Sequence, residues 1–376
     1  IRATKAAITA DDGFFALENV SLDGRTYKAY THAPKTVIEM LQSSRSHGDL
    51  EFIIYQGRRY SFDRYYQLVD AMAASLQDDY QLKKGERVAI AMRNNPEWVI
   101  AYAAATLLGA IVVPINSWGK TEELNYAIDD CQARILVCDP PRLKLLEPVI
   151  DRLNIDIIVT DENTQANKAQ RIANFDDLLT AGEGKSYQVA EVVPEDICLI
   201  LYTSGSTGKP KGVVLSHRNL IVGAQSVAEY LENDANDVLL ALLPLSFDYG
   251  LSQITTSLLT GATCVLMDYF LAGDVVKTIE KHQVTGLAAV PPLWQQLMKV
   301  KWPDTATNQL RYFTNSGGAM PTVTLNQLRA TFQQAKPYLM YGLTEAFRST
   351  YLPPELVDER LGSMGKAIPN AEIMVV

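Results

Sequence analysis

The stretch Leu201–Gly212, LYTSGSTGKPKG, decides how the rest of this sequence is interpreted. It follows an apolar run and combines glycines, hydroxyl side chains and two lysines. Glycine lets the backbone turn sharply and bring its N–H groups close to an anion, and hydroxyls and lysines supply further donors and positive charge. The stretch therefore predicts a phosphate-binding loop, although its composition also allows a flexible surface turn. It lacks the GxxxxGKS/T pattern, because Gly205 and Gly208 are spaced differently and Pro210 follows Lys209.

Strand-like and helix-like segments alternate on both sides of this loop. Such alternation predicts an α/β fold with mainly parallel sheets flanked by helices. The predicted strands are 87–92, 110–114, 135–138, 155–159, 197–202, 213–216, 238–243, 263–267, 286–290, 312–316 and 338–341. The predicted helices are 98–108, 121–131, 143–153, 218–231, 251–259, 274–282, 291–300 and 322–332. The more polar stretch 160–191 is the expected join between two lobes.

Length and composition limit the classes of protein to which the chain can belong. It has 376 residues, so two or more lobes are expected, because single domains hold about 100–200 residues. Hydrophobic residues make up 47% of the chain, which is enough for a large core and excludes disorder as the main state. The formal net charge of −9 argues against broad nucleic-acid binding, which needs a basic surface.

The cysteines and the longest apolar stretch both favour a cytoplasmic protein without an integral membrane segment. No two of the four cysteines have CxxC spacing, so buried thiols in a reducing compartment are favoured over disulfides or a zinc site. The apolar stretch 98–115 is best divided at Gly109. Asn95 is a good N-cap and Pro96 suits a first helical position, so a buried helix and then a strand are expected. Neither piece approaches the ~20 residues that cross a bilayer.

Four segments, in order along the chain, resemble the signatures of the AMP-forming adenylating enzymes. They are 202–212, SGGAMP at 316–321, YGLTE at 341–345 and GSMGKAIP at 362–369. That superfamily comprises acyl-CoA and aryl-CoA synthetases, adenylation domains of peptide synthetases, and luciferases. PLSFDYG at 244–250 and YGLTEAFRSTYLPPE at 341–355 further resemble acyl-CoA AMP-ligases associated with bacterial exosortase systems.

The resemblance implies a reaction and its cofactors. A substrate carboxylate attacks the α-phosphorus of ATP, giving acyl-AMP and pyrophosphate, with Mg²⁺ as the metal. The acyl group then passes to a thiol, either of CoA or of a carrier-protein phosphopantetheine arm, so an acyl-carrier protein is a candidate partner. It also implies lobes at 50–185 and 190–345, the start of a distorted β-barrel at 346–376, and a C-terminal α+β domain absent from this sequence. With that domain would go the ribose-binding Asp, the hinge residue and the catalytic Lys.

Residue roles carry over from the resemblance. Thr344, Glu345 and Lys209 are implied as catalytic, with Glu345 as the Mg²⁺ ligand. The residues implied to hold the nucleotide are Thr203, Ser204, Gly205, Ser206, Thr207, Gly208, Lys209, Gly317, Gly318, Ala319, Tyr341, Gly342 and Thr344. The residues implied to line the acyl pocket are Phe247, Asp248, Tyr249, Ser252, Val290, Pro292, Ser316, Phe347 and Arg348. His217, in the turn after the phosphate loop, is interpreted as structural.

Three alternatives stay open. Asp248 and Arg348 are unexpected in a plain fatty-acid pocket, because an unpaired buried charge is costly. One explanation is that they pair with each other, or that Arg348 points to solvent, and that the pocket is still apolar. The other is that they contact a polar acid such as an amino acid or a hydroxylated acyl group. The run Ser246-Phe247-Asp248 resembles the pocket of amino-acid adenylation units, which is the second enzyme hypothesis. A nucleotide-binding protein without catalysis is the third.

Overall fold

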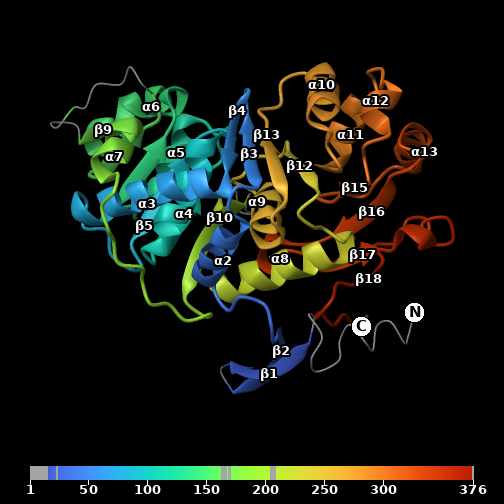
Figure 1. The fold of residues 1–376 in the computed structure, drawn as a ribbon, viewed down its shortest axis with the longest axis horizontal. Helices are drawn as coiled ribbons and strands as arrows, with labels where there is room; N and C mark the ends of the chain where they lie inside the picture. Colours follow the sequence, from blue (N-terminus) through green and yellow to red (C-terminus); the bar gives the residue numbers. More distant parts are fainter. Residues whose placement is uncertain (1–15, 23, 162–166, 168–170, 204–208, 375–376) are drawn as a thin grey trace.

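The computed structural model describes residues 16–22, 24–161, 167, 171–203 and 209–374. The predicted phosphate-loop residues from Ser204 to Gly208 lie outside the described residues. The described strands form one seven-stranded sheet, one nine-stranded sheet and a two-stranded ribbon (Figure 1).

Parallel pairing dominates both large sheets, as the sequence predicts. The seven-stranded sheet has the spatial order β11 (Lys211–Ser216), β10 (Ile197–Thr203), β6 (Ile111–Pro114), β5 (Arg87–Ala91), β7 (Ile135–Cys138), β8 (Asp156–Val159) and β9 (Ile172–Asn174). The nine-stranded sheet has the order β18 (Lys366–Ala367), β17 (Thr350–Leu352), β16 (Lys336–Tyr341), β15 (Tyr312–Asn315), β14 (Gly286–Ala289), β12 (Val238–Ala241), β13 (Thr263–Leu266), β3 (Glu51–Tyr55) and β4 (Arg58–Ser61). The ribbon pairs β1 (Leu17–Leu22) with β2 (Arg25–Tyr30).

Helices cover both sheets (Figure 1). They are α2 (Val37–Ser43), α3 (Phe62–Asp78), α4 (Pro96–Leu107), α5 (Thr121–Asp130), α6 (Pro140–Leu146), α7 (Phe175–Gly182), α8 (His217–Leu231), α9 (Asp248–Thr260), α10 (Ala272–His282), α11 (Pro291–Leu297), α12 (Asp304–Thr307) and α13 (Thr322–Thr331). Short 3₁₀ turns occupy Ser44–His47, Glu147–Arg152, Thr344–Ala346 and Pro354–Leu356.

The apolar core follows the alternation of side chains along the strands. Val88 and Ile90 of β5 belong to a large cluster that α3, α4, α8 and α9 fill between the two sheets. Ala89 and Ala91 point to the other face, where α5 and α6 cover the seven-stranded sheet. The outer face of the nine-stranded sheet packs against α10, α11 and α13, with Trp294 fully buried. Helices therefore cover both faces of the central strands, and β6, β7 and β14 are buried along their whole length, as strands inside parallel sheets usually are.

The 98–115 stretch folds as predicted. The Asn95 side chain accepts a hydrogen bond from the Trp98 amide, Pro96 opens α4, and Gly109 has φ +72° before β6 begins. The 143–153 prediction was wrong in part. The helix begins at Pro140 and ends at Leu146, and a 3₁₀ turn follows, because Pro148 cannot donate the hydrogen bond that an α-helix requires there.

Each large sheet contains strands from outside its expected lobe. The lobe boundaries themselves stay a prediction. Strands β10 and β11 follow the expected join yet belong to the first sheet, where β10 pairs with β6 and β11 pairs with β10. Strands β3 and β4 precede the first sheet in sequence yet join the second through β13. The stretch 160–191 is more than a join, because it holds β9 and α7. Residues 346–376 supply β17 and β18, which extend the nine-stranded sheet, and the described residues form no closed barrel.

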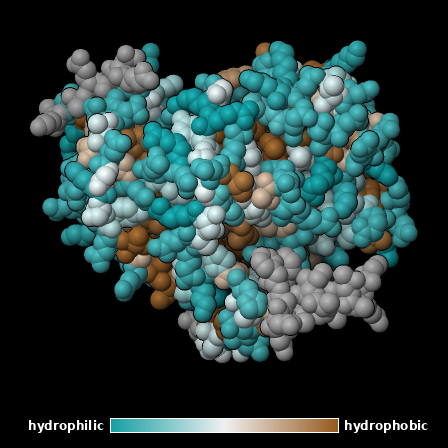
Figure 2. Space-filling view, viewed as in Figure 1, coloured by the Kyte–Doolittle hydropathy of each residue, from teal (hydrophilic) through white to brown (hydrophobic). Residues whose placement is uncertain are grey.

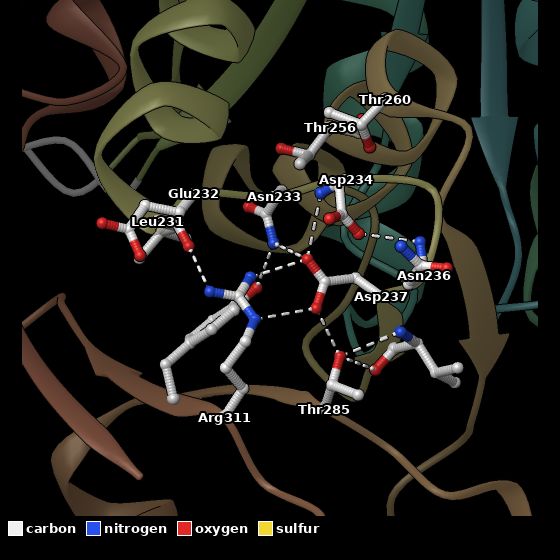
Figure 3. Close-up of polar contacts among 12 residues, drawn as sticks. Leu231, Glu232, Asn233, Asp234, Asn236, Asp237, Thr256, Thr260, Thr285 and Arg311 are labelled. Carbon is white, nitrogen blue, oxygen red and sulfur yellow. Dashed lines mark hydrogen bonds and ion pairs between the residues drawn. The ribbon is translucent and has the colours of Figure 1, made fainter.

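An ion pair between half-buried Arg311 and buried Asp237 stabilises the amino-terminal edge of the nine-stranded sheet (Figure 3). The Asp237 carboxylate accepts hydrogen bonds from Arg311 Nη2 at 2.6 Å, Thr285 Oγ1 at 2.7 Å and Asn233 Nδ2 at 2.9 Å. Arg311 also donates to the Leu231 carbonyl at 2.7 Å, which ties the end of α8 to the same cluster. The cluster directly precedes β12, β14 and β15 in sequence. It therefore lies at the edge of the sheet opposite to the predicted site.

Two further sequence predictions can be compared with the described residues. All four cysteines are buried and unpaired. Among the described residues, no helix has both the length and the apolar character needed to span a membrane. On the face that Figure 2 shows, hydrophobic residues form separate small patches on a mainly hydrophilic surface.

Candidate active site

Most predicted site residues lie beyond the carboxyl ends of parallel strands in the nine-stranded sheet. The connections that follow β12, β14, β15 and β16 begin at Leu242, Val290, Ser316 and Gly342. From β12 the chain goes first to β13 on one side, and then to β14 on the other side. Such a reversal of strand order opens a crevice at the carboxyl edge, where ligands of open α/β sheets bind.

The turn predicted to hold adenine packs directly on the connection after β14. Gly317 has φ +75°, and a Cβ added there would lie 3.3 Å from Val290 Cγ1. A Cβ on Gly318 would lie 3.2 Å from Pro291 Cγ. Both glycines are exposed, while Ser316 is buried. A flat, side-chain-free surface therefore faces outward at this turn, as a close approach to a planar ligand requires.

The base of the predicted phosphate loop is the β10–β11 hairpin, in which Thr203 pairs with Lys211. The Tyr202 hydroxyl donates to Asp130 Oδ2 at 2.5 Å, which joins the hairpin to the end of α5. Burial and this hydrogen bond raise the Tyr202 pKa far above its ordinary value. Lys209 Nζ lies 5.8 Å from the centre of the Tyr126 ring, also on α5. The hairpin is therefore anchored in the first sheet, while β11 also lies beside the turn Thr344–Ala346.

The predicted YGLTE segment forms the connection between antiparallel strands β16 and β17. Tyr341 pairs with Thr350, and the Ser349 amide donates to the Tyr341 carbonyl at 3.0 Å. Tyr341 and Glu345 are exposed and Thr344 is half-buried. A Cβ on Gly342 would lie 2.9 Å from the Phe347 carbonyl oxygen, so the loop closes on itself only with glycine there.

Asp248 and Arg348 pair with each other, and Arg348 does not point to solvent, whereas their contact with a polar acid stays a prediction. Arg348 Nη1 donates to Asp248 Oδ2 at 2.7 Å, and the side chains are 2% and 18% exposed. Arg348 lies over the Tyr249 ring at 4.6 Å, and its Nη2 donates to Ser252 Oγ at 3.4 Å. Burial disfavours the guanidinium charge, but Asp248, Tyr230 and Tyr249 together more than offset this, so the Arg348 pKa lies above its ordinary value. The Arg348 Nε is buried without a partner.

Six of the nine predicted acyl-pocket residues fall into two groups. Asp248, Tyr249, Ser252 and Arg348 are in contact at the start of α9, where the Tyr249 hydroxyl also lies 2.5 Å from Thr314 Oγ1 of β15. Phe247, which precedes this group, is 40% exposed. Val290 and Pro292 instead line a separate cavity. Phe347 is buried against α8 and is treated below.

That cavity has a volume of about 260 Å³ and lies between the carboxyl ends of the two sheets. Its lining residues include Arg93, Trp118 and Asp268, which sequence reasoning missed. The Arg93 guanidinium lies 3.1 Å from the centre of the Trp118 ring. Burial raises the Asp268 pKa against the opposing charge of Arg93. Only the position of these residues after predicted strands could have indicated them. Arg93 and Trp118 follow strands of the seven-stranded sheet, and Asp268 follows a strand of the nine-stranded sheet.

One lining residue, Asn94, connects the two sheets directly. Its Nδ2 donates to the Ala241 carbonyl at 3.0 Å and the Leu243 carbonyl at 2.9 Å. Its Oδ1 accepts from the Leu245 amide at 3.0 Å. Asn94 follows β5 of the seven-stranded sheet, and its three partners follow or end β12 of the nine-stranded sheet. The amide therefore fixes the two walls of the cavity relative to each other.

The donor set for a metal is limited. Among the described residues, no three His, Cys, Asp or Glu side chains gather so as to hold a metal ion. Glu345 offers a single exposed carboxylate beside the phosphate hairpin. This arrangement fits Mg²⁺, which is commonly held by one or two carboxylates together with substrate phosphates.

His217 has a structural environment, as the sequence predicts. Its Nδ1 accepts a hydrogen bond from the Val37 amide at 3.2 Å, which links the start of α8 to the start of α2. The residue is buried, and burial lowers its pKa from 6.5 to about 4. The ring is therefore neutral at pH 7 and acts as an acceptor.

Comparison with known proteins gives matches along most of the chain. A family described as AMP-binding enzyme matches residues 41–376. The 2-succinylbenzoate–CoA ligase of Bacillus velezensis is 32% identical over 324 residues, which cover 86% of this chain and 62% of that protein. The 4-coumarate–CoA ligase 3 of Arabidopsis thaliana is 30% identical over 336 residues, which cover 85% and 58%.

Solved structures share the fold. The complex of VinN with L-aspartate has a TM-score of 0.76 and 30% identity, with coverage of 89% of this chain and 82% of that one. The inhibitor-bound N-terminal domain of FACL13 from Mycobacterium tuberculosis also has a TM-score of 0.76, with 26% identity and coverage of 89% and 83%. The chain spans about three fifths of the length of the two curated ligases it matches.

Proposed function

The chain belongs to the AMP-binding enzyme family, and from this premise we propose that it activates a carboxylic acid with ATP. A carboxylate oxygen attacks the α-phosphorus, the bond to the pyrophosphate oxygen breaks, and acyl-AMP and pyrophosphate form. The observation that carries the proposal is the meeting of the predicted segments at one edge of the nine-stranded sheet. There the Gly317–Gly318 turn lies on Val290 and Pro291, and the β10–β11 hairpin lies beside Thr344–Ala346.

The residues have distinct proposed roles. The Gly317–Ala319 turn and Tyr341 hold adenine, Thr344 donates to the α-phosphate, and Lys209 neutralises the outer phosphates. Such a transfer needs little covalent help from the protein, because fixed donors and positive charge stabilise the transition state. Glu345 would hold Mg²⁺, which supplies charge neutralisation at the phosphates when it is bound.

The acceptor in the proposed second step is a thiol. The relatives named above are CoA ligases, which supports CoA as the acceptor. A carrier-protein phosphopantetheine arm carries the same thiol chemistry and is the alternative acceptor. A thiolate attacks the acyl carbon, AMP leaves, and a thioester forms. Parallel assays with CoA and with a phosphopantetheinylated carrier protein separate the two acceptors.

We further propose that Asp248 and Arg348, although they pair with each other, also contact a polar substrate acid. A buried guanidinium with a free Nε offers a donor to a carboxylate or hydroxyl, and Asp248 offers an acceptor to an ammonium or hydroxyl. One structural relative was solved with L-aspartate bound, which is an acid of this kind. Amino acids, dicarboxylic acids and hydroxylated acids are therefore the first candidates, ahead of plain alkanoic acids.

Acid-dependent exchange of labelled pyrophosphate into ATP tests the proposed activation. Panels of amino acids, dicarboxylic acids, aryl acids and alkanoic acids would be compared at equal concentration. Asp248→Ala should lose activity on the preferred polar acid and gain relative activity on alkanoic acids. A preference for long alkanoic acids that Asp248→Ala leaves unchanged would refute the polar pocket. Nucleotide binding without exchange on any acid would instead favour the non-catalytic alternative.

A further inference from the structure

We infer that Phe347 and Gly223 form a clamp that positions the loop carrying Thr344 and Glu345 for the proposed adenylation. The clamp consists of the Phe347 ring, seated against the backbone of α8 at Gly223, and a strained turn at Phe347. The inference rests on the proposed function, because Thr344 and Glu345 are the residues that it places. Phe347 and Gly223 are positioning residues in this account and do not contact the reacting atoms.

The backbone at Phe347 has a conformation that non-glycine residues rarely adopt. Its φ is +59° and its ψ is −59°, and the Arg348 amide donates to the Ala346 carbonyl at 2.6 Å. These values describe a γ-turn of the rare positive-φ kind, which persists only where surrounding contacts impose it. The turn comes two residues after Glu345, so its geometry fixes the direction in which the loop leaves the site.

The contact that imposes the turn is visible at α8. A Cβ added at Gly223 would lie 2.4 Å from Phe347 Cδ1 and 2.8 Å from Cγ. The ring therefore occupies the space that any other residue at position 223 would fill. Phe347 is 1% exposed and belongs to the large cluster between the two sheets. A glycine in the middle of a helix is unfavourable by itself, so its presence needs a packing reason of this kind.

A second anchor follows the first in sequence. Arg348 is buried and paired with Asp248, and its Nη1 also donates to the Phe347 carbonyl at 2.5 Å. From Gly342 to Ser349, only Phe347 and Arg348 are buried. Two adjacent residues thus hold an otherwise accessible loop, one by its aromatic ring and the other by an ion pair. Loss of the ring contact should let the turn relax and move Glu345.

The test compares two glycine substitutions in helices. Gly223→Ala places a methyl group in the space that the Phe347 ring occupies. The methyl group of Gly273→Ala in α10 would meet no atom within 4 Å, so this variant is the matched control. We expect Gly223→Ala to lower kcat for acyl-AMP formation about 10–100-fold, because small misplacements at a reacting centre have effects of this size. The midpoint of the Mg²⁺ titration should rise, since Glu345 moves. Gly273→Ala should match the wild type in both measurements.

A double-mutant cycle separates positioning from general destabilisation. In a Phe347→Ala background the ring is gone, so Gly223→Ala should cause no further loss of kcat and no further shift of the Mg²⁺ midpoint. If Gly223→Ala acts only on stability, the active fraction falls but kcat per folded molecule and the Mg²⁺ midpoint stay at their wild-type values. That result would overturn the clamp.

Hydrogen exchange gives a measurement that does not depend on activity. Gly223→Ala should increase deuterium uptake in peptides covering 342–349, while Gly273→Ala should leave uptake there unchanged. Unchanged uptake in Gly223→Ala would overturn the inference even if the wild type forms acyl-AMP. If the wild type forms no acyl-AMP with any acid, the proposed function fails, and the exchange result alone decides whether the clamp exists.

Discussion

Replacing Asn94 by Asp tests the connection between the two sheets. The substitution keeps the shape of the side chain but removes both N–H donors, so the carbonyls of Ala241 and Leu243 lose their bonds at 3.0 and 2.9 Å. Two lost hydrogen bonds account for about 2 kcal/mol at about 1 kcal/mol each. Asn94 is 4% exposed, so a carboxylate facing two carbonyl oxygens adds a desolvation cost. We expect a total loss of about 3–5 kcal/mol in the free energy of unfolding at pH 7.

The loss should depend on pH in a defined direction. Burial beside carbonyl oxygens raises the folded-state pKa of the new Asp above its unfolded value of about 3.9. Stability from a group with a raised folded pKa is present at low pH and is lost as pH rises, so the deficit against wild type should shrink on acidification. Protonation restores one donor, which is the physical reason for the partial recovery.

Urea unfolding followed by fluorescence and by circular dichroism measures this deficit at pH 7 and at pH 5. The exposed Asn308 provides the control, because Asn308→Asp makes the same chemical change without burying a charge. A deficit below about 0.5 kcal/mol in Asn94→Asp, which is the usual range for surface substitutions, would refute the view that Asn94 fastens the sheets. A deficit that grows as pH falls would refute the assigned hydrogen-bond pattern.

Three other predictions concern buried ionisable groups. As the pH falls from 6.5 to 4, the wild type should lose roughly 3 kcal/mol more stability than His217→Asn. In the wild type the unfolded chain protonates His217 over this range, whereas the folded ring, with a pKa of about 4, stays neutral. Arg311→Met should cost about 3–5 kcal/mol at pH 7, because it leaves the Asp237 carboxylate buried without its counter-charge. Burial alone would raise the Asp237 pKa, but hydrogen bonds from Arg311, Thr285 and Asn233 outweigh burial and lower it. The stability deficit of Arg311→Met should therefore shrink as the pH falls and the carboxylate protonates. Asp248→Asn should cost a similar amount by stranding the buried Arg348 charge.

Exposed groups provide the controls for the Arg311 and His217 changes. Arg329 and Asp358 form an exposed pair, so Arg329→Met should change the free energy of unfolding by no more than about 1 kcal/mol. His32, which is exposed, is the control for His217, and the His32→Asn variant is compared over the same pH range. Equal losses in buried and exposed variants would show that burial is not the cause.

Local chemistry made several elements predictable from the sequence. The helix α4 could be bounded because Asn95, Pro96 and Gly109 act within one turn of its ends. The hairpin of β3 and β4 was missed, although Gln56 and Gly57 both have positive φ as a two-residue turn requires. Gln is uncommon in such turns, so the local signal was weak, and the strand is stabilised by β13, which is more than 200 residues away in sequence.

The nucleotide-site motifs could be recognised because each is contiguous and its backbone demands are local. The glycines at 317 and 318 allow a side-chain-free turn wherever the chain is placed. Gly223 carried a usable signal, because glycine is unfavourable in the middle of a helical run, but the sequence alone could not show that Phe347 fills the space beside it.

By itself, the sequence determined the α/β class, the order of strands β5–β8 and β10–β16 along the chain, and the segments from which a nucleotide site would be built. Only the tertiary structure decided which strands share a sheet, that Asp248 reaches Arg348, and that Asn94 joins the two carboxyl edges. The physical reason is one of range. Propensities, caps and turns act over a few residues, whereas pairing, burial and charge compensation depend on partners 100 or more residues away, which the fold alone brings together.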